Sequence, residues 1–245
     1  LPGRPIGTQG VMLNTPCPVS RLPGFADGDV SVQDAAAQLA APLLLAGAAL
    51  PSGARVLDAC AAPGGKTAHL LELADLDVLA LDHDAERLTR VGETLDRLHL
   101  HARMQAGDAS QPSTWWDGKP FDAILLDAPC TASGIVRRHP DVRWLRRPSD
   151  VPALAATQAR LLDALWPLLS PGGRLLYSTC SVFKAEGQDQ IDAFLQRQSD
   201  ASRVVDPPSP GHLLPLPDNQ PPAENPGSAA RADGFFYALL QKNQV

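Results

Sequence analysis

Cysteine is scarce in this chain and widely spaced. The 245 residues include four cysteines and no Cys-x-x-Cys pair, which argues against a secreted disulfide framework and against a zinc site made of cysteines. Free thiols in this pattern are typical of a reducing compartment, so the sequence predicts a cytoplasmic protein without a metal ion. The four residues are Cys17, Cys60, Cys130 and Cys180.

An excess of positive charge is also lacking. The 21 Lys and Arg residues are outnumbered by 27 Asp and Glu residues, and the net charge is −6. Such a surface repels a polyanion as a whole, so contact with nucleic acid needs a local basic patch. No run approaches 18 apolar residues and no signal-peptide pattern is present, so no membrane partner is predicted. The first residue is not Met, which is compatible with a piece of a longer protein.

Proline and glycine divide the chain into an arm and one sizeable domain. Residues 1–30 are rich in both and are predicted to form a linker or N-terminal extension without helices. Residues 31–245 are long enough and apolar enough for a single domain. At its start, Ala and Leu recur at helical spacing over residues 31–51, with Ser31 or Asp34 as a possible N-cap and Pro42 as a kink or break.

Apolar strands then alternate with helices. This pattern is typical of a parallel sheet covered on both faces, so the fold class is a doubly wound α/β fold. After residue 198 a proline-rich stretch with Pro221, Pro222 and Pro226 predicts a long surface loop, followed by a last strand that need not be parallel. The predicted strands are 55–58, 77–82, 102–108, 121–127, 173–178 and 234–240, and the predicted helices are 66–74, 85–98 and 151–169.

A glycine-rich turn follows the first of these strands and precedes a helix. Such a turn presents backbone N–H groups and a helix N-terminus at the edge where open α/β sheets bind ligands. The turn departs from a P-loop, because Cys60 stands where the first glycine belongs, and it lacks a dinucleotide fingerprint. A plain structural turn stays open as an alternative. The turn consists of Cys60, Ala61, Ala62, Pro63, Gly64, Gly65 and Lys66.

Three acids end the next strands. Asp82, Asp108 and Asp127 are expected at the same sheet edge, where an acid commonly binds ribose hydroxyls. A single Asp is more often a cap or turn residue. Three together suit a ligand that carries a ribose, an amino-bearing base and positive charge but no phosphate. S-adenosylmethionine fits this description.

Two of the cysteines also follow predicted strands, in Asp127-Ala-Pro-Cys130 and Ser178-Thr-Cys180-Ser181. These motifs and the glycine-rich turn resemble those of the RNA cytosine-C5 methyltransferases. Further similarity to the group that acts on bacterial 16S ribosomal RNA lies in residues 32–35, 137–141 and 233–238. The resemblance implies a Rossmann-like methyltransferase fold with a seven-stranded, mostly parallel sheet and an antiparallel last strand. It also implies that the turn, Asp82, Asp108 and Asp127 hold S-adenosylmethionine, and that a separate N-terminal RNA-binding part belongs to the full-length protein.

The resemblance assigns roles to the thiols. Cys180 is the expected nucleophile toward C6 of cytosine, and Cys130 is expected to assist breakdown of the adduct. Asp127 is expected to contact both the cytosine edge and the cofactor. An unperturbed thiol is only about 3% ionised at pH 7, so a neighbouring cation should favour the anion, and Lys66 is the candidate. Cys17 and Cys60 are expected to serve mainly as small hydrophobic side chains.

A basic segment follows Cys130 and includes Trp144. Positive charge there would bind phosphates of ribosomal RNA at the mouth of the site, although a solvated loop with surface ion pairs is the alternative. Two other functions also stay open: a methyltransferase for a different substrate, and an RNA-binding ribosome-assembly module with a vestigial site. We expect a monomer. The predicted RNA-binding residues are Arg137, Arg138, Arg143, Arg146 and Arg147.

Overall fold

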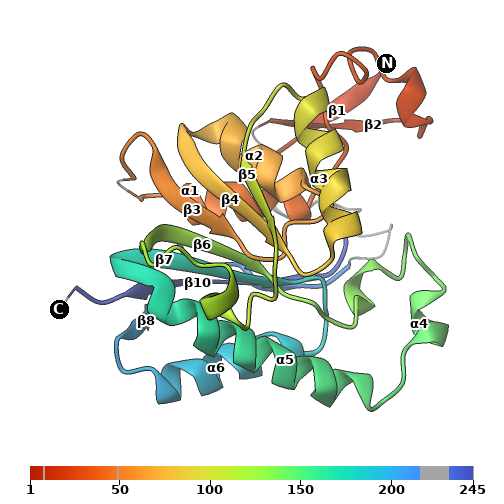
Figure 1. The fold of residues 1–245 in the computed structure, drawn as a ribbon. Coiled ribbons are helices and arrows are strands. Elements are labelled where there is room, and N and C mark those ends of the chain that lie inside the picture. Colours follow the sequence, from red (N-terminus) through yellow and green to blue (C-terminus); the bar gives the residue numbers. More distant parts are fainter. Residues whose placement is uncertain (8, 49, 216–231, 245) are drawn as a thin grey trace.

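The computed structural model describes residues 1–7, 9–48, 50–215 and 232–244. Its main feature is a twisted sheet of eight strands that crosses the molecule (Figure 1). A separate two-stranded sheet lies in the N-terminal arm. The strands are β1 (Gly3–Ile6), β2 (Gly10–Leu13), β3 (Ala54–Asp58), β4 (Leu76–Asp82), β5 (Arg103–Ala106), β6 (Phe121–Asp127), β7 (Leu169–Thr179), β8 (Ala201–Arg203), β9 (Gly211–Leu213) and β10 (Phe235–Lys242).

Five strands of the main sheet are parallel, in the order β5-β4-β3-β6-β7. Strand β10 continues the sheet antiparallel to β7, and β8 pairs antiparallel with β10. These seven strands confirm the predicted mostly parallel sheet with an antiparallel last strand. The eighth strand, β9, pairs with β10 beside this path. Residues in the middle of β3, β4 and β6 are buried, which explains why their sequences are continuous apolar runs.

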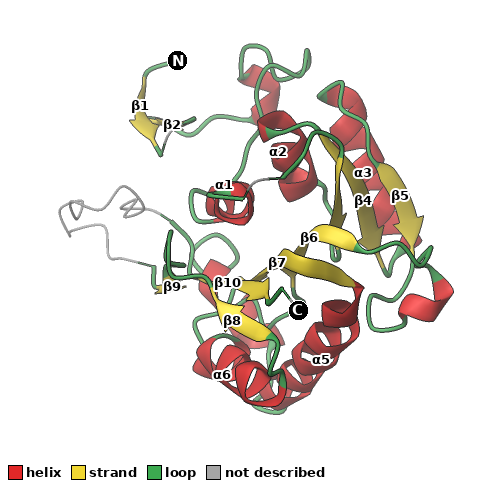
Figure 2. Ribbon diagram, turned by 90° about the vertical axis from the view of Figure 1, so that its left-hand side faces the viewer, coloured by secondary structure: helices red, strands yellow, loops and turns green. Residues whose placement is uncertain are grey.

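Helices cover both faces of the sheet. In Figure 2, α1, α2 and α3 lie on one side of the strands, and α5 and α6 lie on the other. Leu44 of α1 packs in one apolar cluster with Leu125 of β6, and Leu162 of α5 packs in another with Ile124 of the same strand. The helices are α1 (Ala40–Leu45), α2 (Gly65–Leu73), α3 (Ala85–Arg97), α4 (Val142–Leu145), α5 (Asp150–Leu165) and α6 (Gln188–Arg197).

The first predicted helix is much shorter than expected. Residues 31–36 are not helical, and α1 begins only at Ala40, after a short 3-10 helix, Ala37–Leu39. Pro42 therefore lies in the first turn of α1, where its missing N–H costs nothing, and it neither kinks nor divides a longer helix. Asp34 instead accepts a hydrogen bond from Ala36 N at 2.9 Å, in a turn before the helix.

Other differences lie in segments without strong periodicity. The N-terminal arm contains the β1–β2 hairpin, and α6 follows β7 where no helix was predicted. The predicted strand 102–108 ends at Ala106, so Asp108 lies in the following loop. The proline-rich stretch contributes β8 and β9, whereas Pro221, Pro222 and Pro226 lie outside the described residues. Among the helices that the structure describes, we find none with the length and apolar character of a membrane span.

The arm is attached to the domain through α3. Arg97 donates hydrogen bonds to Phe25 O at 2.8 Å and Val30 O at 3.0 Å, and its guanidinium lies 4.1 Å from the centre of the Phe25 ring. Three contacts from one side chain thus fix the segment that joins the arm to α1.

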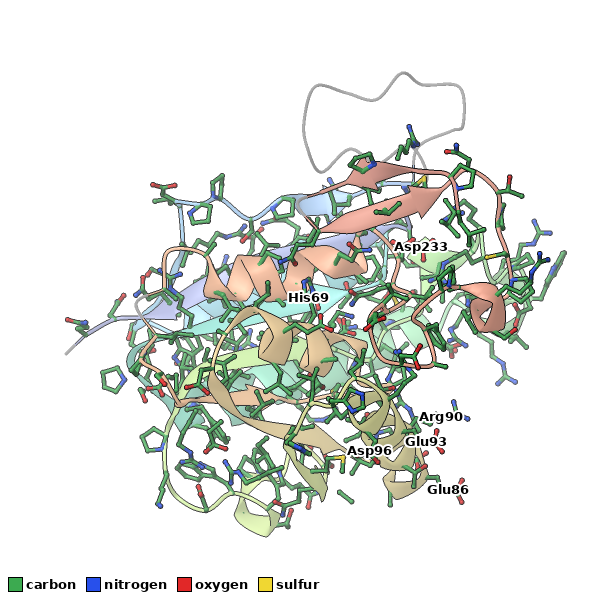
Figure 3. All side chains as sticks on the ribbon, turned by 90° about the horizontal axis from the view of Figure 1, so that it is seen from above. His69, Glu86, Arg90, Glu93, Asp96 and Asp233 are labelled. Carbon is green, nitrogen blue, oxygen red and sulfur yellow. The ribbon has the colours of Figure 1, made fainter. Side chains whose placement is uncertain are left out.

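We predict that Arg97→Ala releases this segment, because both carbonyls lose a charged donor, at a cost of about 1–3 kcal/mol. Limited proteolysis should then cut within residues 20–32 faster than in the parent. Arg90→Ala is the matched control, because Arg90 extends from α3 into solvent (Figure 3). Equal cleavage rates in the parent and Arg97→Ala would contradict the assignment.

Candidate functional site

The candidate site lies at one edge of the parallel sheet. In the sheet register, Asp58 at the end of β3 pairs with Leu125 of β6 and Ala80 of β4, and Asp127 at the end of β6 pairs with Ser178 of β7. Parallel strands bring their carboxyl ends to the same edge. The glycine-rich turn, the strand-end acids and Cys180 consequently meet there, as predicted.

The glycine-rich turn is held in place by α3 and β4. Gly64 has φ 98°, a left-handed conformation that favours glycine, and a Cβ there would lie 3.1 Å from Val91 Cα. Ala62 N donates to Asp82 Oδ2 at 3.1 Å, and Thr94 Oγ1 donates to Pro63 O at 3.0 Å. The turn therefore has both a conformational and a packing reason for its glycine, and it ends at the N-terminus of α2.

Asp58 is a site residue that the motif search missed. Its side chain is buried, Thr67 Oγ1 donates to Oδ2 at 2.7 Å, and Oδ1 has no hydrogen-bond partner among the described residues. Burial is the main cause that raises the pKa of Asp58 to about 7. A buried acceptor without a donor is costly and suggests a missing ligand group. An acid at the end of a strand, two residues before the glycine-rich turn, was the signal in the sequence.

Asp82 and Asp108 differ in their surroundings. Asp82 is buried, and besides Ala62 N it accepts a hydrogen bond from Asp84 N at 3.1 Å. Asp108 is exposed and accepts from Ser110 N at 2.8 Å and Gln111 Nε2 at 3.0 Å. A further hydrogen bond, from Ser110 Oγ at 2.7 Å, is the main cause that lowers the pKa of Asp108. Asp82 thus braces the turn, while Asp108 is an ionised acid at the rim.

Asp127 is bound on both oxygens. Lys66 Nζ lies 2.6 Å from Oδ2, and Ser178 Oγ donates to Oδ1 at 2.8 Å. Burial opposes the charge of Lys66, but the charge and hydrogen bond of Asp127, together with Asp58 and Cys180, outweigh burial and raise the pKa of Lys66. Lys66 is therefore a cation at the centre of the site. Its first partner is Asp127 rather than a thiol.

The two motif cysteines are in contact. Cys130 Sγ lies 3.4 Å from Cys180 Sγ, although 50 residues separate them in the chain. The hydrogen bond with Cys180, followed by burial, raises the pKa of Cys130 well above its usual value. Cys130 is thus held as the protonated thiol, and its S–H can donate to Cys180.

Cys60 is not part of this thiol pair, and its surroundings are different. It is partly buried against the apolar cluster around Leu57, and burial is the main cause that raises its pKa. Such a thiol is inert. Cys17 is partly exposed in the N-terminal arm. Among the described residues, no cluster of three His, Cys, Asp or Glu side chains could hold a metal ion.

The basic segment is less free than its sequence indicates. Arg138 forms two hydrogen bonds with the buried Asp233, and Arg137 lies 3.2 Å from the same carboxylate and 3.6 Å from Asp34. Asp233 is labelled in Figure 3. Two motifs that are about 95 residues apart thus bind each other. These two arginines therefore form ion pairs within the protein, as the alternative to phosphate binding expects.

The rest of the segment is more open. Arg146 Nε donates to Thr131 O at 2.8 Å, next to Cys130. Arg143 lies 5.1 Å from the centre of the Trp144 ring, and Trp144 is 78% exposed. Arg147 is also exposed. An aromatic ring and two charged side chains therefore face solvent near the site.

Comparison with known proteins agrees with this geometry. The family model described as "16S rRNA methyltransferase RsmB/F" matches residues 48–241. A protein of Xanthomonas campestris named ribosomal RNA small subunit methyltransferase B is 53% identical over 97% of this chain and 53% of its own length. A protein of the same name from Vibrio cholerae is 52% identical over 96% of this chain and 51% of its own length. The chain spans about half the length of the curated relatives it matches.

Solved structures are similar in fold. A methyltransferase homologue from Pyrococcus horikoshii has a TM-score of 0.75 and 29% identity, covering 96% of this chain and 75% of that one. A structure titled NSun6 from the same organism, with SFG, has a TM-score of 0.73 and 25% identity, covering 97% and 61%. The family model covers most of the chain and includes the glycine-rich turn and both motif cysteines. This chain belongs to the 16S rRNA methyltransferase RsmB/F family.

Proposed function

We propose that this chain is the catalytic part of an S-adenosylmethionine-dependent methyltransferase that modifies C5 of a cytosine in small-subunit ribosomal RNA. The observation that carries the proposal is the contact between two thiols, 3.4 Å apart, at the sheet edge that also carries Lys66, Asp127 and the glycine-rich turn. The names of the relatives support ribosomal RNA as substrate. Because the chain spans about half the length of these relatives, we also propose that an N-terminal RNA-binding part of a longer protein would add RNA affinity.

The site fits S-adenosylmethionine. The unpartnered Oδ1 of buried Asp58 needs a donor, and the α-amino group of the cofactor would supply one. The turn at residues 60–66 offers backbone N–H groups at a helix N-terminus, and Asp82 and Asp108 supply carboxylates for ribose and base. Asp127 lies between this cradle and the thiols. When bound, the cofactor supplies an electrophilic methyl group.

Cys180 is the nucleophile in this proposal. Its thiolate adds to C6 of the cytosine ring, and the π electrons of the C5=C6 bond move into the ring toward N3. C5 thereby becomes nucleophilic, and S-adenosylmethionine held by the turn at residues 60–66 and the strand-end acids would supply its methyl group there and leave as S-adenosylhomocysteine. Asp127 contacts the cytosine edge, and Lys66, whose Nζ lies 2.6 Å from Asp127 Oδ2, supplies the positive charge that stabilises the ring as negative charge develops at N3. A negative charge on Cys180 is one of the causes that raise the pKa of Lys66 and the pKa of Arg138.

Cys130 resolves the adduct. Before reaction, the contact with Cys180 is the main cause that holds the pKa of Cys130 high. Once Cys180 is bonded to carbon it carries no charge, so ionisation of Cys130 becomes easier. Cys130 loses its proton to solvent, and its thiolate accepts the C5 proton. The electrons of the C5–H bond re-form the C5=C6 bond, and the Cys180–C6 bond breaks to regenerate the Cys180 thiolate. The two thiols thus act in sequence.

The deciding experiment compares Cys180→Ala and Cys130→Ala with methyl-labelled cofactor and unmethylated small-subunit RNA. We expect Cys180→Ala to lose at least 1,000-fold in transfer, as about 4 kcal/mol of covalent catalysis would imply, and to form no adduct. Cys130→Ala should form a protein–RNA adduct that survives denaturing gel electrophoresis. Cys17→Ala, in the N-terminal arm, is the matched control and should keep its transfer activity.

Full transfer by Cys180→Ala would overturn the assignment of the nucleophile. If the parent chain transfers nothing, the assay is repeated with the full-length protein. Absence of transfer there too, with RNA binding intact, would favour the ribosome-assembly function instead.

Cofactor affinity should depend on pH through Asp58. Because the pKa of Asp58 is raised to about 7, the acid is mostly protonated at pH 6 and mostly ionised at pH 8. The ionised form attracts a cationic amino group, so S-adenosylhomocysteine should bind more tightly as pH rises through 7. Asp58→Asn should bind at least tenfold more weakly at pH 8, without that rise. Calorimetric titration at pH 6, 7 and 8 measures both effects, and a parent-like pH profile in Asp58→Asn would contradict the role.

RNA affinity should depend on the exposed part of the basic segment. We expect the double variant Arg143→Ala, Arg147→Ala to weaken RNA binding and to reduce the slope of log K against log salt concentration by about 1–2. Filter binding over a range of salt concentrations measures this slope. Arg90→Ala on α3 removes a surface charge elsewhere and is the control. An unchanged salt slope in the double variant would show that RNA lies elsewhere.

A further inference from the structure

One buried carboxyl group lies between the two thiol loops and has no role in the chemistry proposed above. Glu186 ends a short 3-10 helix, Lys184–Glu186, that follows β7, and its side chain is fully buried. No ion pair involves it in the described part of the chain. A buried carboxylate without a cation is costly unless hydrogen bonds satisfy it. The groups that donate hydrogen bonds to Glu186 therefore show which segments it holds in place.

On one side, Glu186 holds the segment around Cys130. Its Oε1 accepts a hydrogen bond from Thr131 N at 2.9 Å, and its Oε2 accepts one from Thr131 Oγ1 at 2.5 Å. Gln158 Nε2 bridges the same carboxylate, at 3.2 Å, to Pro129 O, at 2.9 Å. The residues before and after Cys130 are both tied to Glu186, one directly and one through Gln158.

On the other side, Glu186 holds the segment around Cys180. Its Oε2 also accepts a hydrogen bond from Ser181 Oγ at 2.6 Å. Its backbone carbonyl accepts from Tyr177 Oη at 2.9 Å and from Thr179 Oγ1 at 3.1 Å. The residues that flank Cys180, Thr179 and Ser181, are therefore anchored to the same glutamate.

We propose that Glu186 is a positioning residue that sets the separation of the Cys130 and Cys180 thiols. One carboxylate binds Thr131 and Ser181, which directly follow the two cysteines, so the Sγ–Sγ distance is set by hydrogen bonds to a single group. Both carboxyl oxygens of Glu186 have hydrogen-bond donors, and buried hydrogen-bond networks of this kind rigidify their surroundings. A misplacement of about 1 Å can reduce a reaction rate roughly 100-fold. The proposal rests on the proposed roles of the two thiols, which need this spacing.

The spacing can be measured without methyl transfer. Phenylarsine oxide forms two As–S bonds with a pair of close thiols and releases water, so its affinity reports the Cys130–Cys180 separation directly. The parent should bind one equivalent tightly, whereas Cys130→Ala and Cys180→Ala should not. This measurement stands even if the chain methylates no RNA, so failure of the inference and failure of the proposed function are distinguishable.

The key variant is Glu186→Gln. It keeps the size of the side chain and one acceptor oxygen, but it places an amide nitrogen against the hydroxyls of Thr131 and Ser181. We expect at least a tenfold weaker affinity for phenylarsine oxide, with affinity for S-adenosylhomocysteine within twofold of the parent. In the methylation assay, kcat should fall at least tenfold while KM for the cofactor stays within twofold. Glu93→Gln, the same change on the solvent side of α3 (Figure 3), should leave all of these unchanged.

Parent-like affinity for the arsenical in folded Glu186→Gln would overturn the proposal, as would an equal loss of arsenical and cofactor affinity, which marks a general loss of structure. If Glu186→Gln does not fold, Thr131→Val decides the question, because it removes one hydroxyl donor and keeps the backbone N–H. Weaker arsenical binding with unchanged cofactor affinity in Thr131→Val supports the positioning role, and parent-like arsenical binding contradicts it.

Discussion

The site depends on the common direction of β3, β4, β6 and β7. Because these strands are parallel, residues that are more than 100 positions apart in the chain, such as Asp58 and Cys180, reach one sheet edge. There the Lys66–Asp127 ion pair links the helix that follows the glycine-rich turn to the end of β6. The pair lies between the glycine-rich turn with its acids and the two thiols. In the proposed function, this one charged contact links the residues that would bind the cofactor to the residues that would carry the covalent chemistry.

Much of the fold follows from hydrophobic pattern, and the failures have physical causes. Continuous apolar runs identified the parallel strands because burial on both faces requires them. Helix α6 was missed in a short, polar segment. The helix at residues 31–51 was predicted too long because Ala35 and Ala36, which fit helical spacing, lie in a turn before the helix. Asp108 follows its strand by two residues, which a pattern of apolar residues cannot resolve.

The candidate site was predictable in its members but not in its pairings. The motifs named Lys66, Asp127, Cys130 and Cys180, and the structure brings them together. Spacing along the chain does not show which side chains form ion pairs with each other. The sequence therefore could not indicate that Lys66 pairs with Asp127. Nor could it indicate that Arg137 and Arg138 pair with Asp233. Asp58 and Glu186 were missed because a buried acid looks like any strand-end or loop acid until its hydrogen bonds are known.

The position of β10 has a consequence for how the protein is made. This strand lies between β7 and β8, and just before it Gly234 N donates to Gly134 O, while Gly134 N donates to Cys180 O. A side chain at position 134 would collide with the Gly234 carbonyl. During translation, β8 has no sheet neighbour and the loop after Cys130 lacks its support until residues 233–242 leave the ribosome. The loop that follows Cys130 therefore gains its contact with Gly234 only after almost all of the 245 residues have been synthesised.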